Sequence, residues 1–254
     1  MSCDTLQDMT PVRTIEVTRV SKFLGHVEQE KKAEERKSNK ADFIFRGQRT
    51  DAPLLPRLAR TVQESRFVNI ERLMFKEFQR TSLALTDRGL TSDWDFLSLA
   101  QHHRLPTRLL DWTYSALAGL WLAVEKPPKK AHAIAYPGVV WLLKTKADDF
   151  IDEDTRASPF ANGVTRIYRP RVTTGRIAAQ SGLFTIHRVM KGKGLVALEK
   201  NSYFVERLVK FVIPGSAFTD IRKHLHGCGV NRFSLFPDLD GLSDHLAWRY
   251  TGKL

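Results

Sequence analysis

The residues with the most conspicuous chemistry lie between positions 101 and 113, where a glutamine, two histidines, two arginines and an aspartate are interspersed with apolar residues. Arg108 and Asp111 sit next to residues that belong in a core, and a charge at a core boundary is costly unless it is paired. Two interpretations stay open: a buried structural ion pair between Arg108 and Asp111, or a functional site.

Two predicted helices must hold this stretch in place. Ser92 and Asp95 form a capping-box signal, and the helix that begins there is expected to end at Leu105 and Pro106. Thr113 is predicted to cap a second helix. The apolar residues of that helix recur every three or four positions and so face a core: Ala116, Leu117, Leu120, Trp121 and Val124. The polar residues in between are therefore expected on a short rigid segment.

Histidines and aspartates suggest two further kinds of chemistry. His103 is a candidate general base oriented by Asp111, although a single helical histidine is more often simply hydrogen-bonded. His102 and His103 cannot face one metal from a helix, because adjacent residues diverge by about 100° around the axis. Asp238 and Asp240 suit Mg²⁺ in a nuclease, but a helix cap is the plainer interpretation. No metal ligand is assigned.

The chain is strongly basic, with 40 Lys and Arg against 28 Asp and Glu and a formal net charge of +12. This excess predicts a polyanionic partner, either nucleic acid or a phosphate-rich small molecule. Two cysteines, Cys3 and Cys228, provide neither a disulfide framework nor zinc spacing, which favours the reducing cytoplasm. The longest apolar stretch, residues 116–124, is too short to span a bilayer, so no membrane partner is expected.

The hydrophobic pattern predicts one α+β domain, a single mixed β-sheet flanked by helices. The domain is assigned to residues 20–254, after an N-terminal lead of residues 1–19. The mixed-charge run of residues 28–37 is expected to be the solvated end of a helix. Other segments are predicted as follows: strands at 42–48, 138–143 and 209–213, an irregular loop at 144–165, an edge strand at 167–170, a bent strand at 175–187, and a basic turn at 190–194.

Several stretches together resemble the FRG domain, a family named for its Phe/Tyr-Arg-Gly motif and found mainly in bacteria and phages. The resemblance runs from about residue 20 to the C-terminus. The stretches that carry it are Phe45-Arg46-Gly47-Gln48, Leu55-Pro56-Arg57-Leu58, residues 101–113, Gln180-Ser181-Gly182-Leu183-Phe184 and residues 236–242. The stretch at 101–113 is its most specific part.

The chain also resembles, more weakly, the ADP-ribosyltransferases, many of which open their core with a strand that ends in Tyr-Arg-Gly. This resemblance implies an ADP-ribosyltransferase-like fold, NAD as the substrate, and Arg46 gripping the pyrophosphate as a bidentate fork. It implies catalytic roles for Arg46, Asp111 and Gln180, and the candidate general base His103 is a fourth catalytic candidate from the residues themselves. It implies NAD-binding roles for Arg46, Gly47, Gln48, Thr107, Arg108, Thr113 and Phe184. Gln180 stands where a glutamate is expected, so Asp111 or Glu206 would have to supply the negative charge.

The function expected from this second resemblance is that of an NAD-dependent ADP-ribosyltransferase-like effector of the toxin or anti-phage type. Its acceptor would be nucleic acid, and a neutralising antitoxin protein would be a further partner. Two alternatives stay open. A metal-dependent nuclease would need Asp238, Asp240 and a histidine within reach of one ion, and a non-catalytic nucleic-acid-binding module would need a continuous basic face.

Overall fold

The structure is a computed structural model of the 254-residue chain. It describes residues 11–37, 41–86, 89–128, 130–131, 134–151, 158–161, 163–172, 174–190 and 194–252. None of the helices in these ranges is long and apolar enough to cross a membrane.

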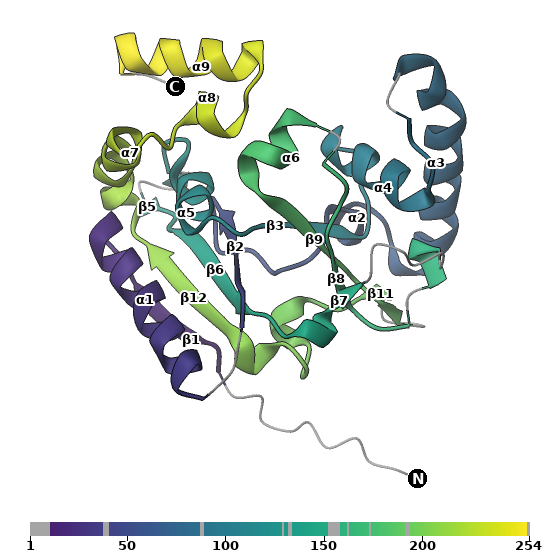
Figure 1. Cartoon of the computed structure of the whole chain (residues 1–254), viewed down its shortest axis with the longest axis horizontal. Coiled ribbons are helices and arrows are strands. Elements are labelled where there is room, and N and C mark those ends of the chain that lie inside the picture. The colour runs from purple at the N-terminus through teal and green to yellow at the C-terminus, as the bar shows by residue number, and fades with distance from the viewer. Residues whose placement is uncertain are drawn as a thin grey trace.

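A mixed eight-stranded sheet forms the centre of the described molecule, with strand order β1-β12-β6-β2-β3-β9-β8-β7 (Figure 1). The outer pairs β1/β12 and β7/β8 are parallel, and the other neighbours are antiparallel. The strands are β1 (Arg13–Glu16), β2 (Phe43–Gln48), β3 (Leu109–Thr113), β6 (Gly138–Lys144), β7 (Phe150–Ile151), β8 (Arg166–Tyr168), β9 (Gly182–Ile186) and β12 (Leu208–Ile213). Two small ribbons pair β4 (Lys130–Ala131) with β5 (Ile134–Ala135), and β10 (Val189–Met190) with β11 (Gly194–Leu195).

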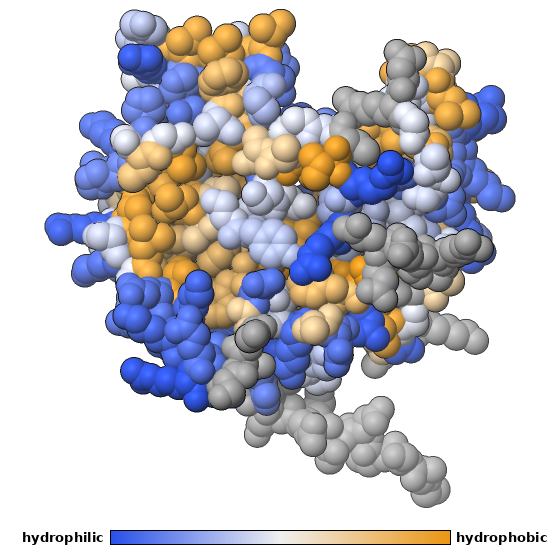
Figure 2. All heavy atoms as spheres, viewed as in Figure 1, coloured by the Kyte–Doolittle hydropathy of each residue, from blue (hydrophilic) through white to orange (hydrophobic). Residues whose placement is uncertain are grey.

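Helices flank this sheet, in agreement with the α+β prediction. They are α1 (Val20–Arg36), α2 (Arg57–Thr61), α3 (Phe67–Ser82), α4 (Asp93–His102), α5 (Ala116–Val124), α6 (Gly175–Gln180), α7 (Phe218–Gly227), α8 (Arg232–Leu235) and α9 (Leu239–Thr251). Figure 1 places α1 and α7 at one end of the molecule and α3 and α4 at the other. The outer side of α1 is mainly hydrophilic (Figure 2), whereas α3 also exposes Leu73.

Alternation along the strands divides the core between the two faces. Phe45 of β2 packs with α1, α5 and α7, in a cluster that includes Phe23, Trp121 and Phe211. Ile44, its neighbour in sequence, joins a second cluster on the opposite face with Trp112, Trp141 and Phe204. A third cluster lies where α3 and α4 meet the sheet and includes Phe75, Trp94, Leu109 and Phe184. Arg46 follows Phe45 in β2, so its side chain leaves the sheet on the same face as that of Ile44.

The structure corrects several local predictions. The segment between α4 and α5 is not a plain connector, because residues 109–113 form β3 inside the sheet. Ser115 rather than Thr113 caps α5, while the predicted capping box of Ser92 and Asp95 is confirmed. Residues 175–187 are a short helix followed by a strand rather than one bent strand. The predicted edge strand at 167–170 corresponds to β8, which lies inside the sheet, and β7 forms the edge instead. The predicted loop at 144–165 contains β7 and two short 3-10 helices.

The charged end of α1 is also less solvated than predicted. Glu30 and Glu34 are buried, and both carboxylates accept from Lys144 Nζ, at 2.7 and 3.0 Å. Arg13 of β1 makes an ion pair with Glu30. The lead of residues 1–19 thus contributes a strand to the sheet, although the domain boundary at residue 20 stays a prediction. Of the basic turn at 190–194, residues 191–193 lie outside the described residues.

Gly47 is required where α5 crosses β2. A Cβ atom at this position would lie 2.0 Å from the Gly119 carbonyl oxygen and 2.7 Å from the Ala123 amide nitrogen, and both are backbone atoms that cannot rotate away. Gly47→Ala is therefore expected to lower the free energy of unfolding by about 1–3 kcal/mol, measured by urea unfolding. In the matched control Gly25→Ala, the new Cβ meets nothing within 4 Å inside α1. That variant should gain about 0.5–1 kcal/mol; equal behaviour of the two variants would contradict the close approach.

His187 is a fully buried neutral histidine directly after β9. Trp112 Nε1 donates to Thr185 Oγ1 at 3.1 Å. His187 Nδ1 lies 3.2 Å from the Val196 carbonyl, which can only accept, so Nδ1 carries the proton and Nε2 accepts from Thr185. Burial lowers the pKa of His187 from 6.5 to about 4, with only a minor opposing contribution from the Val196 hydrogen bond.

This histidine predicts acid sensitivity. In the unfolded chain His187 binds a proton below about pH 6.5, whereas in the folded chain it does so only below about pH 4. The free energy of unfolding is therefore highest above about pH 6.5 and falls by about 3 kcal/mol between pH 6.5 and pH 4. Urea unfolding of wild type and His187→Gln at about pH 7.5 and about pH 4.5 measures the effect. The wild type should lose more stability than the variant on acidification. Identical losses would show that His187 does not carry the proton linkage.

Candidate functional site

The candidate site begins where the sheet opens between β2 and β3. These strands share one residue pair, Phe45 with Thr113, whereas β2 and β6 are paired over six residues. Past that pair, Arg46 Nη1 donates to the backbone carbonyl of Asp111 at 2.8 Å and lies 3.6 Å from its carboxylate. The Arg46 side chain is only 15% exposed, while that of Asp111 is 57% exposed. The Arg46 guanidinium thus lies between β2 and β3 where they separate, and the Asp111 carboxylate next to it faces solvent.

A short hydrogen-bond chain fixes the direction of the Asp111 carboxylate. Gln101 Nε2 on α4 donates to Asp111 Oδ2 at 3.0 Å, and Thr107 Oγ1 donates to Gln101 Oε1 at 2.7 Å. Thr107 is buried and also accepts from the Leu109 amide. Because each group of Gln101 has a partner, its amide cannot flip without losing a hydrogen bond.

Four more arginines converge on Arg46 and Asp111. They come from α2, from the residues after α4 and from α6, and line a cavity of about 180 Å³: Arg57, Arg60, Arg104 and Arg176. We call this cavity, with Arg46 and Asp111, the Arg46 cleft. Asp111 is the one acidic side chain among the described residues that line it. Five guanidinium groups and a single carboxylate give the cleft an excess of positive charge, which suits an anion with several charges.

The pKa shifts of two of these arginines have burial as their main cause and the neighbouring positive charges as a smaller one. Burial lowers the pKa of Arg46 from its usual value; Asp111 acts in the opposite direction, and the charge of Arg60 lowers the pKa further. Burial is also the main cause of the lowered pKa of Arg176, where Asp111 again opposes and the charge of Arg104 adds to the lowering. A bound phosphate or carboxylate would offset this mutual repulsion.

The backbone at Arg104 is held in an unusual conformation. Its φ is 66°, in the left-handed region that favours glycine. The segment ends α4 in a Schellman motif, with hydrogen bonds from the Leu105 amide to the Ala100 carbonyl and from the Arg104 amide to the Gln101 carbonyl. Glycine would suit this position better, so the strained backbone makes Arg104 a candidate functional residue.

Arg104→Gly is therefore expected to stabilise the fold by about 1 kcal/mol, because strain at the end of α4 is relieved. The same change should weaken binding of a polyphosphate to the cleft, measured by calorimetric titration with pyrophosphate. Higher thermal stability with unchanged pyrophosphate affinity would mean that Arg104 does not serve the cleft. Lower stability would contradict the argument from strain.

A second cavity lies directly beside the Arg46 cleft and shares Asp111, Arg176, Gln101 and His102 with it. Gln180 and Phe184 line this second cavity. Gln180 Nε2 donates to the Leu235 carbonyl at 3.0 Å, and the Gln180 carbonyl accepts from Thr113 Oγ1. Gln180 therefore ties β3, α6 and α8 together at the edge of the site.

Residues 41–132 match the family model of the FRG domain. This part of the chain is therefore similar to the FRG domain. No curated protein and no solved structure matches the chain. The FRG segment contributes Arg46, Arg57, Arg60, Arg104 and Asp111 to the cleft, whereas Arg176 and Gln180 follow it in the chain.

The site residues predicted from the sequence divide into cleft residues and structural residues. Arg46, Asp111, Gln180 and Phe184 line the two joined cavities. Gly47 lies against α5, Gln48 Nε2 donates to the Ala52 carbonyl, and Thr113 is buried. His103 is an exposed residue at the end of α4, and His102 rather than His103 lines the cleft, so the predicted pairing of His103 with Asp111 is not formed.

The predicted ion pair between Arg108 and Asp111 is wrong. Arg108 is buried and makes a bidentate ion pair with Glu71 of α3, in which Arg108 Nε lies 2.8 Å from Glu71 Oε1. Its guanidinium also lies over the ring of Phe160, 5.1 Å from the centroid. Arg108 lies directly before β3, and its pairing with Glu71 directs its guanidinium to α3 rather than to Asp111. Arg108 is thus a structural residue of the FRG segment.

The nuclease alternative finds little support around Asp238 and Asp240. Asp238 Oδ1 accepts from the Gly241 amide and caps α9, as the plainer interpretation predicted. The described residues contain no group of three or more His, Cys, Asp or Glu side chains placed to hold a metal ion.

Sequence reasoning missed most of the cleft's arginines. Arg57 belongs to the Leu-Pro-Arg-Leu stretch of the FRG resemblance, and Arg104 lies inside the 101–113 stretch, but neither was assigned a role. The usable signal for Arg57 was its place directly after Pro56, at the start of α2. Arg60 and Arg176 carry no comparable signal, because their approach to the cleft depends on how α2 and α6 pack.

Proposed function

We propose that this protein is an NAD-dependent ADP-ribosyltransferase-like enzyme whose Arg46 cleft binds the pyrophosphate of NAD. The observation that carries the proposal is the set of five arginines around one partly exposed carboxylate, Asp111. A pyrophosphate presents oxygens on two linked phosphorus atoms, and planar guanidinium forks suit that geometry better than ammonium groups. The cleft joins a second, small cavity of about 40 Å³, which Gln180 and Phe184 line.

Four residues of the site have assigned roles in this reaction. Arg46, with Arg57 and Arg104, would hold the phosphates, and Asp111 would face the ribose that carries nicotinamide. The bond between C1′ of that ribose and the nicotinamide nitrogen breaks, nicotinamide leaves, and an acceptor nucleophile forms a bond to C1′ as it loses its proton. Positive charge develops on the ribose during this step, and the Asp111 carboxylate stabilises it.

Asp111 takes the place of the absent glutamate in this scheme. Gln180 Nε2 is committed to the Leu235 carbonyl, and Glu206 lines neither of the two cavities. The Gln101–Thr107 chain already directs the Asp111 carboxylate. Gln180 is then a positioning residue that shapes the second cavity. With nucleic acid as the acceptor, such an enzyme would act as a toxin or anti-phage effector.

Transfer of label from NAD tests the proposal. The purified protein is incubated with NAD labelled in the adenylate part and with total RNA, DNA or cell protein as acceptors. Wild type should attach label to one acceptor class, and Asp111→Asn should reduce the rate about ten- to hundred-fold, because the amide keeps the shape but removes the charge. Asp240→Asn, an exposed carboxylate on α9, serves as the control. Absence of both transfer and NAD hydrolysis by the wild type would contradict the proposal.

A further inference from the structure

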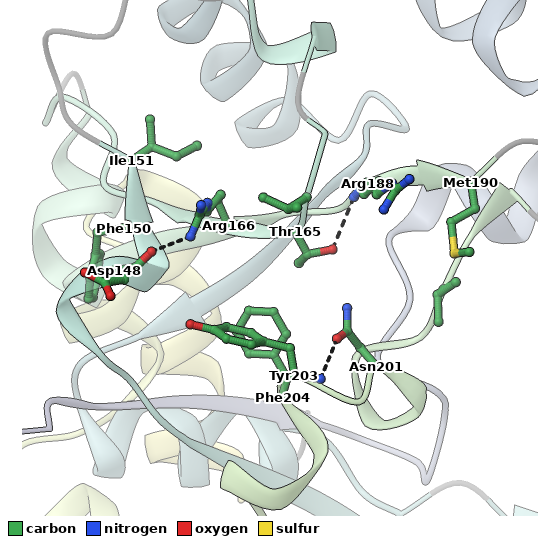
Figure 3. Close-up of a pocket in the computed structure, with 12 residues that line it drawn as sticks. Asp148, Phe150, Ile151, Thr165, Arg166, Arg188, Met190, Asn201, Tyr203 and Phe204 are labelled. Atoms are coloured by element: carbon green, nitrogen blue, oxygen red, sulfur yellow. Dashed lines mark hydrogen bonds between the residues drawn. The ribbon is translucent and has the colours of Figure 1, made fainter. Parts of the chain in front are cut away.

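A larger cavity lies away from the Arg46 cleft, on the side of the sheet edge formed by β7 and β8. Its volume is about 860 Å³, and it shares no lining residue with the cleft. Figure 3 shows Arg166 and Arg188 along one side and Asn201, Tyr203 and Phe204 along the other. The described walls are completed by apolar side chains that include Phe150, Ile151, Val164, Met190 and Val196.

Two polar groups of this cavity, on Arg188 and Asn201, have no hydrogen-bond partner among the described residues. Thr165 Oγ1 accepts from the Arg188 amide, which fixes the backbone but leaves the exposed guanidinium of Arg188 without a partner among the described residues. Asn201 Oδ1 accepts from the Tyr203 amide at 3.0 Å, so the Asn201 amide nitrogen, which has no described partner, remains available as a donor. Arg166 Nη1 is bound to the Asp148 carbonyl and holds that wall in place.

Tyr203 supplies an aromatic surface that the fold does not bury. The residue is 49% exposed, although Phe204 beside it is almost completely buried, at 1%. The Arg207 guanidinium lies 4.6 Å from the Tyr203 ring centroid, and Arg207 is itself anchored by Asp149. The ring therefore contacts a fixed cation and also lines the cavity.

We propose that this cavity binds one nucleotide unit of single-stranded nucleic acid. A base would stack on Tyr203, the Asn201 amide would donate to an acceptor on the base edge, and Arg188 would contact the adjoining phosphate. Exposed aromatic rings next to arginines are the usual means of binding single strands, since every base has a stacking face and every unit a phosphate. The net charge of +12 suits such a partner.

Fluorescence anisotropy with labelled oligonucleotides of about eight nucleotides, measured without NAD, tests this site separately from the proposed transferase activity. Single-stranded RNA and single-stranded DNA of one sequence form the two arms, and their difference reports the contribution of the 2′-hydroxyl. Tyr203→Ala should weaken binding on the order of ten-fold, and Tyr203→Phe should retain it. Arg188→Ala should lower affinity and reduce the salt dependence by about 0.7 in the logarithmic slope.

Two exposed residues outside the cavity provide matched controls. Tyr250→Ala on α9 and Arg72→Ala on α3 remove the same side-chain types and should bind as wild type does. The proposal is overturned if neither strand binds at low salt, if Tyr203→Ala and Arg188→Ala both bind normally, or if a duplex of the same sequence binds as tightly as the single strands. Arg188 has no described structural partner, so its variant keeps the test valid even if Tyr203→Ala loosens Arg207.

Discussion

Replacement of Arg46 by alanine is expected to weaken NAD binding roughly ten- to hundred-fold, corresponding to the loss of about 1.5–3 kcal/mol from charged hydrogen bonds. The Arg46 side chain is only 15% exposed, so water screens its charge little from a bound ligand. Calorimetric titration with NAD, ADP-ribose and nicotinamide separates the parts of the ligand. Affinity for NAD and ADP-ribose should fall together, and any affinity for nicotinamide should be unchanged.

Arg46→Lys should bind NAD nearly as weakly as Arg46→Ala does, because one ammonium group cannot bond the Asp111 carbonyl and a phosphate in the planar arrangement of a guanidinium. Arg72→Ala, an exposed arginine of α3 outside the cleft, controls for the loss of one positive charge. Thermal unfolding of each variant checks that the sheet is intact. If Arg46→Lys binds NAD as wild type does, the role of Arg46 as a bidentate fork is wrong.

Glu71→Ala is expected to have the largest effect on stability, with a loss of about 3–5 kcal/mol. Glu71 and Arg108 side chains are each only 3% exposed, and their bidentate ion pair joins α3 to the start of β3. Removal of Glu71 leaves the Arg108 guanidinium buried without its counter-charge, and this uncompensated charge dominates the cost. Urea unfolding gives the free-energy difference.

Glu77 on the same helix offers a matched control, since it pairs with Arg80 but both side chains are well exposed. Glu77→Ala should cost at most about 0.5 kcal/mol. The double variant Glu71→Leu with Arg108→Met should recover most of the stability lost by Glu71→Ala, because no charge remains in the core. A cost below about 1 kcal/mol for Glu71→Ala would contradict the burial of this pair.

The strands that form the middle of the sheet were largely predictable from the sequence. Residues 43–48, 138–144 and 208–213 are runs of β-branched and aromatic residues, and such runs indicate buried strands in any context. Strand β3 escaped prediction because Asp111 interrupts its apolar pattern and Pro106 suggests a turn. Its identity depends on pairing with β9, about 70 residues later.

The candidate site was predictable only in part, for a similar reason. Arg46 and Asp111 stand out because a strand and an apolar stretch surround them. The partner of Arg108 could not be read from the sequence, since Glu71 lies 37 positions away in an ordinary amphipathic helix. Arg60 and Arg176 look like surface residues until α2 and α6 are packed beside β3.

A crystal structure with NAD bound tests the central claim most directly, namely that the Arg46 cleft is an NAD site. The pyrophosphate is expected within hydrogen-bond distance of Arg46 and at least one of Arg57, Arg104 and Arg176, with the nicotinamide ribose next to Asp111. Density for NAD elsewhere on the protein, or a cleft without NAD in crystals of an active protein soaked at saturating concentration, would contradict the claim.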